Sequence, residues 1–75
     1  MAEEILKDKN REDYFLILKI CSTPISGGEV MKIKTKRDVF EYVVKLKNSG
    51  LITFMDGKYF TTEQGKKLLN GINGK

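Results

Sequence analysis

The sequence of 75 residues contains no histidine and no tryptophan, and it has only one cysteine and one proline. The single cysteine, Cys21, excludes a disulfide bond within the chain. The absence of histidine removes the most common catalytic base and metal ligand, so that a zinc site would have to consist of carboxylates alone. We therefore expect that the protein is not an enzyme and that it has no metal and no cofactor. Cys21 is expected to pack as a small apolar side chain.

The chain also lacks long apolar runs. No run approaches the roughly 20 residues that a helix needs to span a bilayer. The first residues, Met1-Ala2-Glu3-Glu4, have neither the basic region nor the apolar segment of a signal peptide. We expect a soluble, cytoplasmic protein without membrane association. A chain of this length forms one small domain, which buries only about 60% of its unfolded surface and would gain from dimerisation.

Charge is distributed unevenly along the chain. The sequence has 14 Lys and Arg residues against 10 Asp and Glu residues, a net charge of +4. Residues 1–13 carry five acids and three bases, whereas residues 32–47 carry six bases and two acids. A basic window of this kind predicts a polyanionic partner, and a solvated lysine-rich surface is the alternative interpretation.

Two helices and a short strand are predicted in the first half of the chain. The nearly continuous apolar positions of residues 11–21 indicate a helix that is buried on most sides, and Asn10 can cap it. Ile25 is expected to form a strand of one or two residues. Ser26 and Glu29 have the spacing of a capping box, which predicts a short second helix that continues through Val30, Met31 and Ile33.

A third helix is predicted from about residue 36 to residue 48. Thr35 is its expected cap, and Gly50 provides the left-handed residue that ends it. Positions that share one side of this helix form its expected buried stripe. They are Val39, Tyr42, Val43 and Leu46.

The remaining residues predict a hairpin and a final helix. Residues 51–55 and 58–61 flank Asp56-Gly57, a pair that favours the tight type I′ turn. Met31 and Met55 are expected to fill the core. Either Thr61 or Thr62 caps the last helix, which contains the apolar residues 68, 69 and 72.

This order of elements predicts an α+β fold of the winged helix-turn-helix class, with a three-helix core, a short β-hairpin wing and a C-terminal helix. The domain is expected over residues 11–72. Residues 1–10 are expected to be a loose arm, or an extra helical turn that orders on dimerisation. Residues 73–75 are expected to be a disordered tail.

Two motifs carry a family resemblance over roughly residues 11–70. Leu46-Lys47-Asn48-Ser49-Gly50-Leu51-Ile52 is similar to an L-x-x-x-G-L-I junction between recognition helix and wing. Tyr59-Phe60-Thr61-Thr62-Glu63-Gln64-Gly65 resembles the Y-x-L-T-x-x-G start of a final helix, with Thr61 where leucine is usual. The chain thus resembles the winged helix-turn-helix transcription regulators, particularly small archaeal members and those of archaeal viruses and plasmids. The resemblance implies sequence-specific binding of double-stranded DNA.

The resemblance also implies which residues bind. The exposed face of the third helix would contact bases in the major groove, through Arg37, Asp38, Phe40, Glu41, Val44 and Lys45. Phosphates would be contacted by Lys32, Lys34, Thr35, Lys36, Lys47 and Lys58, with backbone N–H groups at the start of the helix also available. Arg37 matches guanine O6 and N7, or is an ordinary surface cation. Phe40 contacts a thymine methyl group, or is the edge of the core.

A homodimer on a paired DNA site is expected, since the first helix has almost no polar face and part of its apolar surface is available to a second copy of the chain. The dimer candidates are Ile5, Leu6, Tyr14, Leu18, Leu68, Leu69 and Ile72. The alternative function is a winged-helix module that binds another protein and not DNA. Asp38 and Glu41 on the third helix favour that alternative, and the surrounding cations oppose it. No small-molecule ligand is evident.

Overall fold

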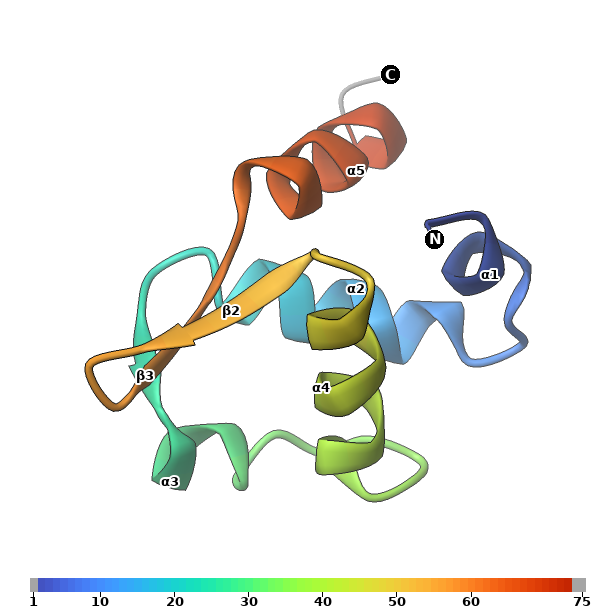
Figure 1. Ribbon diagram of the computed structural model, residues 1–75. Helices are drawn as coiled ribbons and strands as arrows, with labels where there is room; N and C mark the ends of the chain where they lie inside the picture. Colours follow the sequence, from blue (N-terminus) through green and yellow to red (C-terminus); the bar gives the residue numbers. More distant parts are fainter. Residues whose placement is uncertain (1, 74–75) are drawn as a thin grey trace.

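The computed structural model describes the backbone of residues 2–73 and the side chains of residues 4–71. Within this range the chain forms five helices and a three-stranded antiparallel sheet (Figure 1). The elements are α1 (Ala2–Lys7), α2 (Arg11–Ile20), β1 (Ile25–Ser26), α3 (Gly27–Val30), α4 (Val39–Asn48), β2 (Ile52–Met55), β3 (Lys58–Thr61) and α5 (Glu63–Asn73). This small α+β arrangement is compatible with a winged-helix-like fold. None of the helices among these residues has the length and apolar character that crossing a bilayer requires.

The sheet confirms the hairpin and the short strand that the sequence predicts. Its strand order is β1-β3-β2, and Ile25 of β1 lies opposite Tyr59 of β3. At the tip of the hairpin, Asp56 and Gly57 have φ angles of 54° and 77°. Two successive positive φ angles are what a type I′ turn requires, and this turn matches the twist of the flanking strands.

The core lies between α2, α4 and the sheet. The predicted stripe on α4 is confirmed, because Val39, Tyr42, Val43 and Leu46 are at most 7% exposed. Cys21 is fully buried, and burial raises the pKa of its thiol to about 11, so it packs as the expected small apolar group. The other buried apolar residues are Ile5, Tyr14, Ile17, Leu18, Val30, Leu51, Ile52 and Leu69.

The C-terminal end of α4 is closed by a glycine, as predicted. Gly50 has a φ angle of +78°. The N–H of Leu51 donates to the carbonyl of Leu46 at 2.9 Å, and the N–H of Gly50 donates to that of Lys47 at 3.1 Å. These two bonds form a Schellman motif, which satisfies carbonyl groups that the end of a helix leaves without partners.

Two adjacent threonines connect β3 to α5. Thr61 is 1% exposed, and its hydroxyl donates to the Leu18 carbonyl at 2.6 Å. Its N–H donates to the carbonyl of Cys21 at 2.8 Å, so the end of β3 is bonded to the end of α2. The Thr62 hydroxyl accepts the N–H of Gly65 at 3.2 Å. Thr62 is therefore the cap of α5, one of the two alternatives that the sequence left open.

Of the two expectations for the N-terminal residues, the structure shows a helix and not the loose arm, while ordering on dimerisation stays a prediction. Residues 2–7 form α1, and Ile5 is buried in the core with 1% exposure. Asn10 occupies the N-cap of α2, but its side chain makes no capping hydrogen bond. Its own N–H instead donates to the Asp8 carboxylate at 2.8 Å, which fixes the turn between α1 and α2.

The second helix is shorter than predicted. The hydroxyl of Ser26 accepts the N–H of Glu29 at 3.3 Å, which confirms the predicted cap. However, α3 ends at Val30 after four residues. Met31 is 68% exposed and Met55 is 55% exposed, so the expectation that both fill the core is wrong.

The third helix begins at Val39, three residues later than predicted. Its N-cap is Asp38, whose carboxylate accepts the N–H of Phe40 at 3.0 Å. Thr35, the predicted cap, donates its hydroxyl to the carbonyl of Arg37 instead. Asp38 displaces Thr35 because its carboxylate bonds an N–H of the first turn and carries a charge that the helix dipole favours.

Four of the seven predicted dimer residues cannot serve as proposed, because they are buried within one chain. They are Ile5, Tyr14, Leu18 and Leu69, each at most 8% exposed. Leu6 is 39% exposed and Leu68 is half-buried, so their place on a dimer surface stays a prediction. The side chain of Ile72 and residues 74–75 of the expected tail lie outside the described residues.

Candidate functional site

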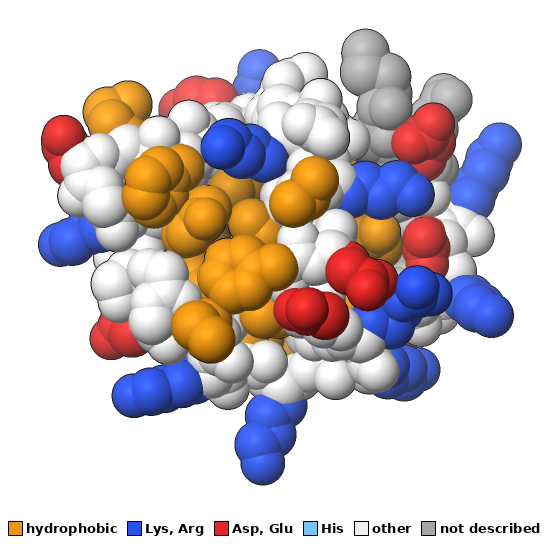
Figure 2. Space-filling view, turned by 60° about the horizontal axis from the view of Figure 1, so that its bottom comes forward, with side chains coloured by type: hydrophobic (Ala, Val, Ile, Leu, Met, Phe, Trp, Pro, Cys, Tyr) orange, Lys and Arg blue, Asp and Glu red, His pale blue; other side chains and the backbone are white. Residues whose placement is uncertain are grey.

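The exposed side of α4 is bordered by the loop of residues 31–38 and by the β2–β3 hairpin. We call this surface the α4–hairpin face. In Figure 2, which looks at this region from the α3 side, apolar side chains gather over one part of the surface. Acidic and basic side chains lie together beside them, and further Lys and Arg side chains project around the edge.

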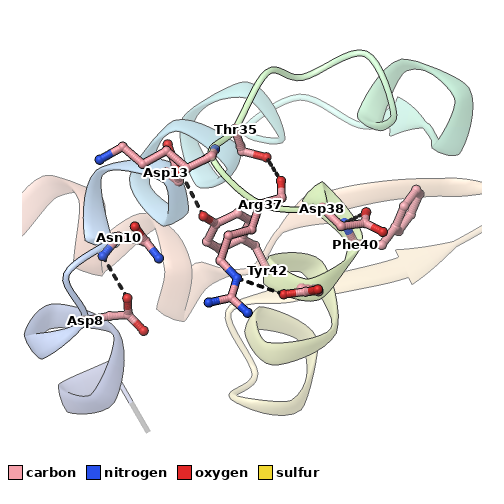
Figure 3. Close-up of polar contacts among 10 residues, drawn as sticks. Asp8, Asn10, Asp13, Thr35, Arg37, Asp38, Phe40 and Tyr42 are labelled. Carbon is pink, nitrogen blue, oxygen red and sulfur yellow. Dashed lines mark hydrogen bonds and ion pairs between the residues drawn. The ribbon is translucent and has the colours of Figure 1, made fainter.

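Asp13 of α2 positions the loop that precedes α4. Its Oδ2 accepts the N–H of Lys36 at 3.0 Å and the hydroxyl of Tyr42 at 2.8 Å (Figure 3). The ring of Tyr42 also meets that of Tyr14 edge-on, with centroids 4.8 Å apart. Burial, together with the bonded carboxylate of Asp13, raises the pKa of Tyr42 to about 12. The sequence does not predict these two bonds of Asp13, because its partners lie 23 and 29 residues away along the chain.

One part of the α4–hairpin face is charged. Arg37, just before α4, donates from Nε to Oε1 of Glu41 at 3.0 Å, and the two side chains are 60% and 57% exposed. An ion pair this exposed contributes little to stability, about 0.5 kcal/mol. The pair borders an open hollow of about 400 Å³ between α4 and the α1–α2 turn. The hollow is lined by Asp8, Lys9, Asn10, Tyr14, Arg37, Glu41, Tyr42 and Lys45.

The other part of the face is apolar. Val44 on α4 is 56% exposed, and Phe54 on β2 is 45% exposed. The ring of Tyr59 on β3 lies between Phe54 and Phe40, with centroids 4.6 Å from Phe54 and 6.3 Å from Phe40, and it packs against the core. Phe40 is half-buried and packs against the core, which supports its interpretation as a core edge while leaving part of it accessible.

The predicted base-contact residues are thus divided between two environments. Arg37, Glu41 and Lys45 line the charged hollow, whereas Phe40 and Val44 belong to the apolar part. The carboxylate of Asp38 is engaged as the cap of α4. Their contact with bases stays a prediction.

The predicted phosphate-contact residues are mostly accessible. Lys32, Lys34, Lys36, Lys47 and Lys58 are exposed, and Thr35 is half-buried. The prediction of free N–H groups at this helix start is wrong for Lys36. That residue lies in the loop before α4, and its N–H donates to Asp13.

The part of the chain that carries this face is basic. Residues 29–58 contain seven Lys and Arg residues and four Asp and Glu residues, all with exposed side chains, a net charge of +3. Two of the four acids, Asp38 and Glu41, are already bonded within the chain. The positive electrostatic potential that remains at this surface favours an anionic partner.

Comparisons with protein-family models, with curated proteins and with solved structures found no match to this chain. Its function is therefore inferred from its own geometry and charge.

Proposed function

We propose that this chain is a sequence-specific, double-stranded DNA-binding transcription regulator of the winged helix-turn-helix kind, acting as a homodimer. α4 would enter the major groove, and the β2–β3 hairpin would lie against the phosphate backbone as a short wing. The observation that carries the proposal is the division of α4. One side is buried in the core, and the opposite side is open to solvent among exposed cations of the preceding loop and the hairpin.

The dimensions of α4 suit a groove. Its 10 residues make a helix about 15 Å long and about 10–12 Å across with its side chains, and the major groove, about 12 Å wide, admits a helix of this diameter. The ion pair uses Nε of Arg37, so the two terminal nitrogens of its guanidinium can bind O6 and N7 of a guanine. Breaking so exposed a pair costs little.

Phosphate contacts would come from elements on several sides of α4. Lys34 and Lys36 lie in the preceding loop, Lys47 lies in the last turn of α4, and Lys58 begins β3. Each lysine that neutralises a phosphate adds about 0.9 to the slope of log affinity against log salt concentration. The homodimer is supported by Leu6, which α1 leaves 39% exposed, and by the small size of the core.

The first test is titration of random duplex DNA with the protein at about 50 mM and about 200 mM salt. The proposal expects binding that weakens steeply with salt. The second candidate function, a module that binds another protein, is favoured by the exposed apolar side chains of Val44 and Phe54. Absence of duplex binding at the lower salt concentration would support this module and reject the DNA regulator.

The second test separates base contacts from phosphate contacts. Arg37→Ala is expected to weaken binding to a site selected from a random library by about 1–3 kcal/mol and to reduce discrimination against other sequences. Lys34→Ala should weaken all duplexes alike. Lys67→Ala removes an exposed cation of α5 and is the matched control. It should change neither the affinity for DNA nor the discrimination between sequences. Unchanged affinity of Arg37→Ala for the selected site would contradict the assignment of α4.

A further inference from the structure

Apolar side chains from the α3–α4 loop, α4 and the hairpin form one exposed patch. Its members are Met31, Phe40, Val44, Phe54 and Tyr59, which we call the apolar patch. Met31 and Phe40 line the same shallow groove, and the aromatic rings of Phe40, Tyr59 and Phe54 follow one another at 6.3 and 4.6 Å. Val44 lies one helical turn beyond Phe40.

The pairing of the hairpin determines which of its residues belong to the patch. Phe54 lies opposite Tyr59, so the two share one face of the sheet. Met55 and Lys58 form the next pair and therefore point to the other face, where they line a separate hollow with Phe60. Met55 is 55% exposed, as much as Val44 at 56%, but it lies outside the patch.

The patch is set within a cationic surface. Lys34 lines the same groove as Met31 and Phe40. Lys47 lies three residues after Val44, and so close to it on the surface of α4. A partner that fits this arrangement is anionic at its edges and apolar at its centre.

The major groove of thymine-rich DNA has these properties. Phosphates run along both edges, and the C5-methyl group of thymine is the apolar group that the bases present in the groove. A G·C pair has no C5-methyl group, so apolar side chains would meet only polar groups there and would leave those groups without hydrogen bonds to water. We infer that the apolar patch binds thymine methyl groups, with Val44 as the central contact, and that the half-site is therefore thymine-rich. This inference rests on the proposed DNA-binding function.

The test replaces thymine by uracil in a DNA site selected from a random library, because uracil lacks only the C5-methyl group. We expect affinity to fall about fourfold for each substituted thymine that faces the patch. Val44→Ala, a change at an exposed helical position, should bind the thymine site more weakly and lose much of the difference between thymine and uracil. Met55→Ala, the matched control on the other face of the hairpin, should keep the full difference.

Other outcomes reject the inference in distinguishable ways. If the protein binds the selected site tightly and uracil binds as well as thymine, the patch does not bind methyl groups, although the DNA-binding function stands. If no duplex binds at low salt, both proposals fail. If light scattering shows a dimer that Val44→Ala or Phe54→Ala dissociates, the patch is a contact between two copies of the chain and the inference is wrong.

Discussion

The two ends of α4 are held by different kinds of contact. At its C-terminal end, the backbone bonds of Gly50 and Leu51 close the helix, and the chain then enters the core through residues that are at most 2% exposed. At its N-terminal end, an eight-residue loop over 31–38 separates it from α3. That loop is held by side-chain contacts, of which the bond from the N–H of Lys36 to Asp13 reaches across the fold, and the same carboxylate accepts the hydroxyl of Tyr42 in α4.

This difference has a functional consequence. The buried end fixes α4 relative to the hairpin, whereas the polar end carries the cations and the ion pair of the α4–hairpin face. Variants at the buried end should therefore change stability most. Variants at the polar end should change stability less and should change DNA binding more.

The largest expected effect is at Gly65 in the first turn of α5. A Cβ atom there would lie 2.4 Å from the carbonyl oxygen of Leu51 and 2.4 Å from Cγ2 of Thr61, distances at which the backbone must shift. Alanine improves helix propensity by about 1 kcal/mol, but overpacking against backbone costs more. We expect Gly65→Ala to destabilise the fold by about 2 kcal/mol and to lower Tm by roughly 10 °C, as measured by thermal unfolding.

The matched control for this variant is Gly71→Ala in the same helix. Among the residues that the structure describes, no atom beyond the chain neighbours and the helix's own backbone lies within 4 Å of a Cβ built at Gly71, so only the gain in helix propensity remains. This variant should raise stability by about 0.5–1 kcal/mol. A Gly65→Ala protein as stable as Gly71→Ala would show that the buried end of α4 is not closely packed.

The buried end is also the part of the fold that the sequence predicts best. Gly50, the Asp56-Gly57 turn and the inner stripe of α4 act through neighbours close in sequence, so their patterns contain the necessary information. The polar end was predicted less well. Thr35 and Asp38 are both acceptable caps, and Asp38 is the one that bonds the first turn. The bond from the N–H of Lys36 to Asp13 joins residues far apart in sequence, and no local pattern shows it.

The candidate site was predicted in the same uneven way. The cations of residues 32–47 are visible in the composition, and they are exposed as expected. Of the apolar patch, Phe40 and Val44 are among the residues predicted on the exposed face of the helix, whereas Met31 and Phe54 are not, because they look like core residues in a pattern of hydrophobicity. They are exposed because α3 ends at Val30 and because Phe54 lies near the tip of the hairpin, beyond the cover of the helices.

The second effect concerns the buried hydroxyl of Thr61. Thr61→Val keeps the shape of the side chain and removes the 2.6 Å hydrogen bond to the Leu18 carbonyl, which is left with the bond from Ser22 at 3.2 Å. We expect a loss of about 1 kcal/mol in denaturant unfolding. Thr53→Val on β2 is the control, since the hydroxyl of Thr53 makes no hydrogen bond with any other residue in the described part of the chain. Equal stability of the two variants would contradict a role for the Thr61 bond.

The third effect tests the polar end through pH. Tyr42→Phe removes the hydrogen bond to Asp13 and should cost about 1 kcal/mol at neutral pH. Because the pKa of Tyr42 is raised to about 12 from 10.0, its contribution to stability is present below pH 10 and is lost between pH 10 and 12. The difference in unfolding free energy between wild type and Tyr42→Phe should therefore shrink over that range.

Tyr14 and Cys21, whose pKa values are also raised, are present in both proteins, so their contributions to this difference cancel. A difference that stays constant up to pH 12 would show that Tyr42 does not contribute in this way.

The smallest effect on stability, and the most direct one on function, is expected at Glu41. Its ion pair with Arg37 is exposed, so Glu41→Gln should change the unfolding free energy by less than about 0.5 kcal/mol. The same change removes a negative charge from the α4–hairpin face and releases the guanidinium of Arg37. Affinity for random duplex DNA at low salt should then rise on the order of threefold, and less at high salt because salt screens exposed charges.

Glu63→Gln in the first turn of α5 removes an acid from another element and should leave DNA affinity unchanged. If Glu41→Gln weakens binding instead, Glu41 itself contacts the DNA, as an acceptor for the amino group of cytosine, and the charged part of the face discriminates between bases.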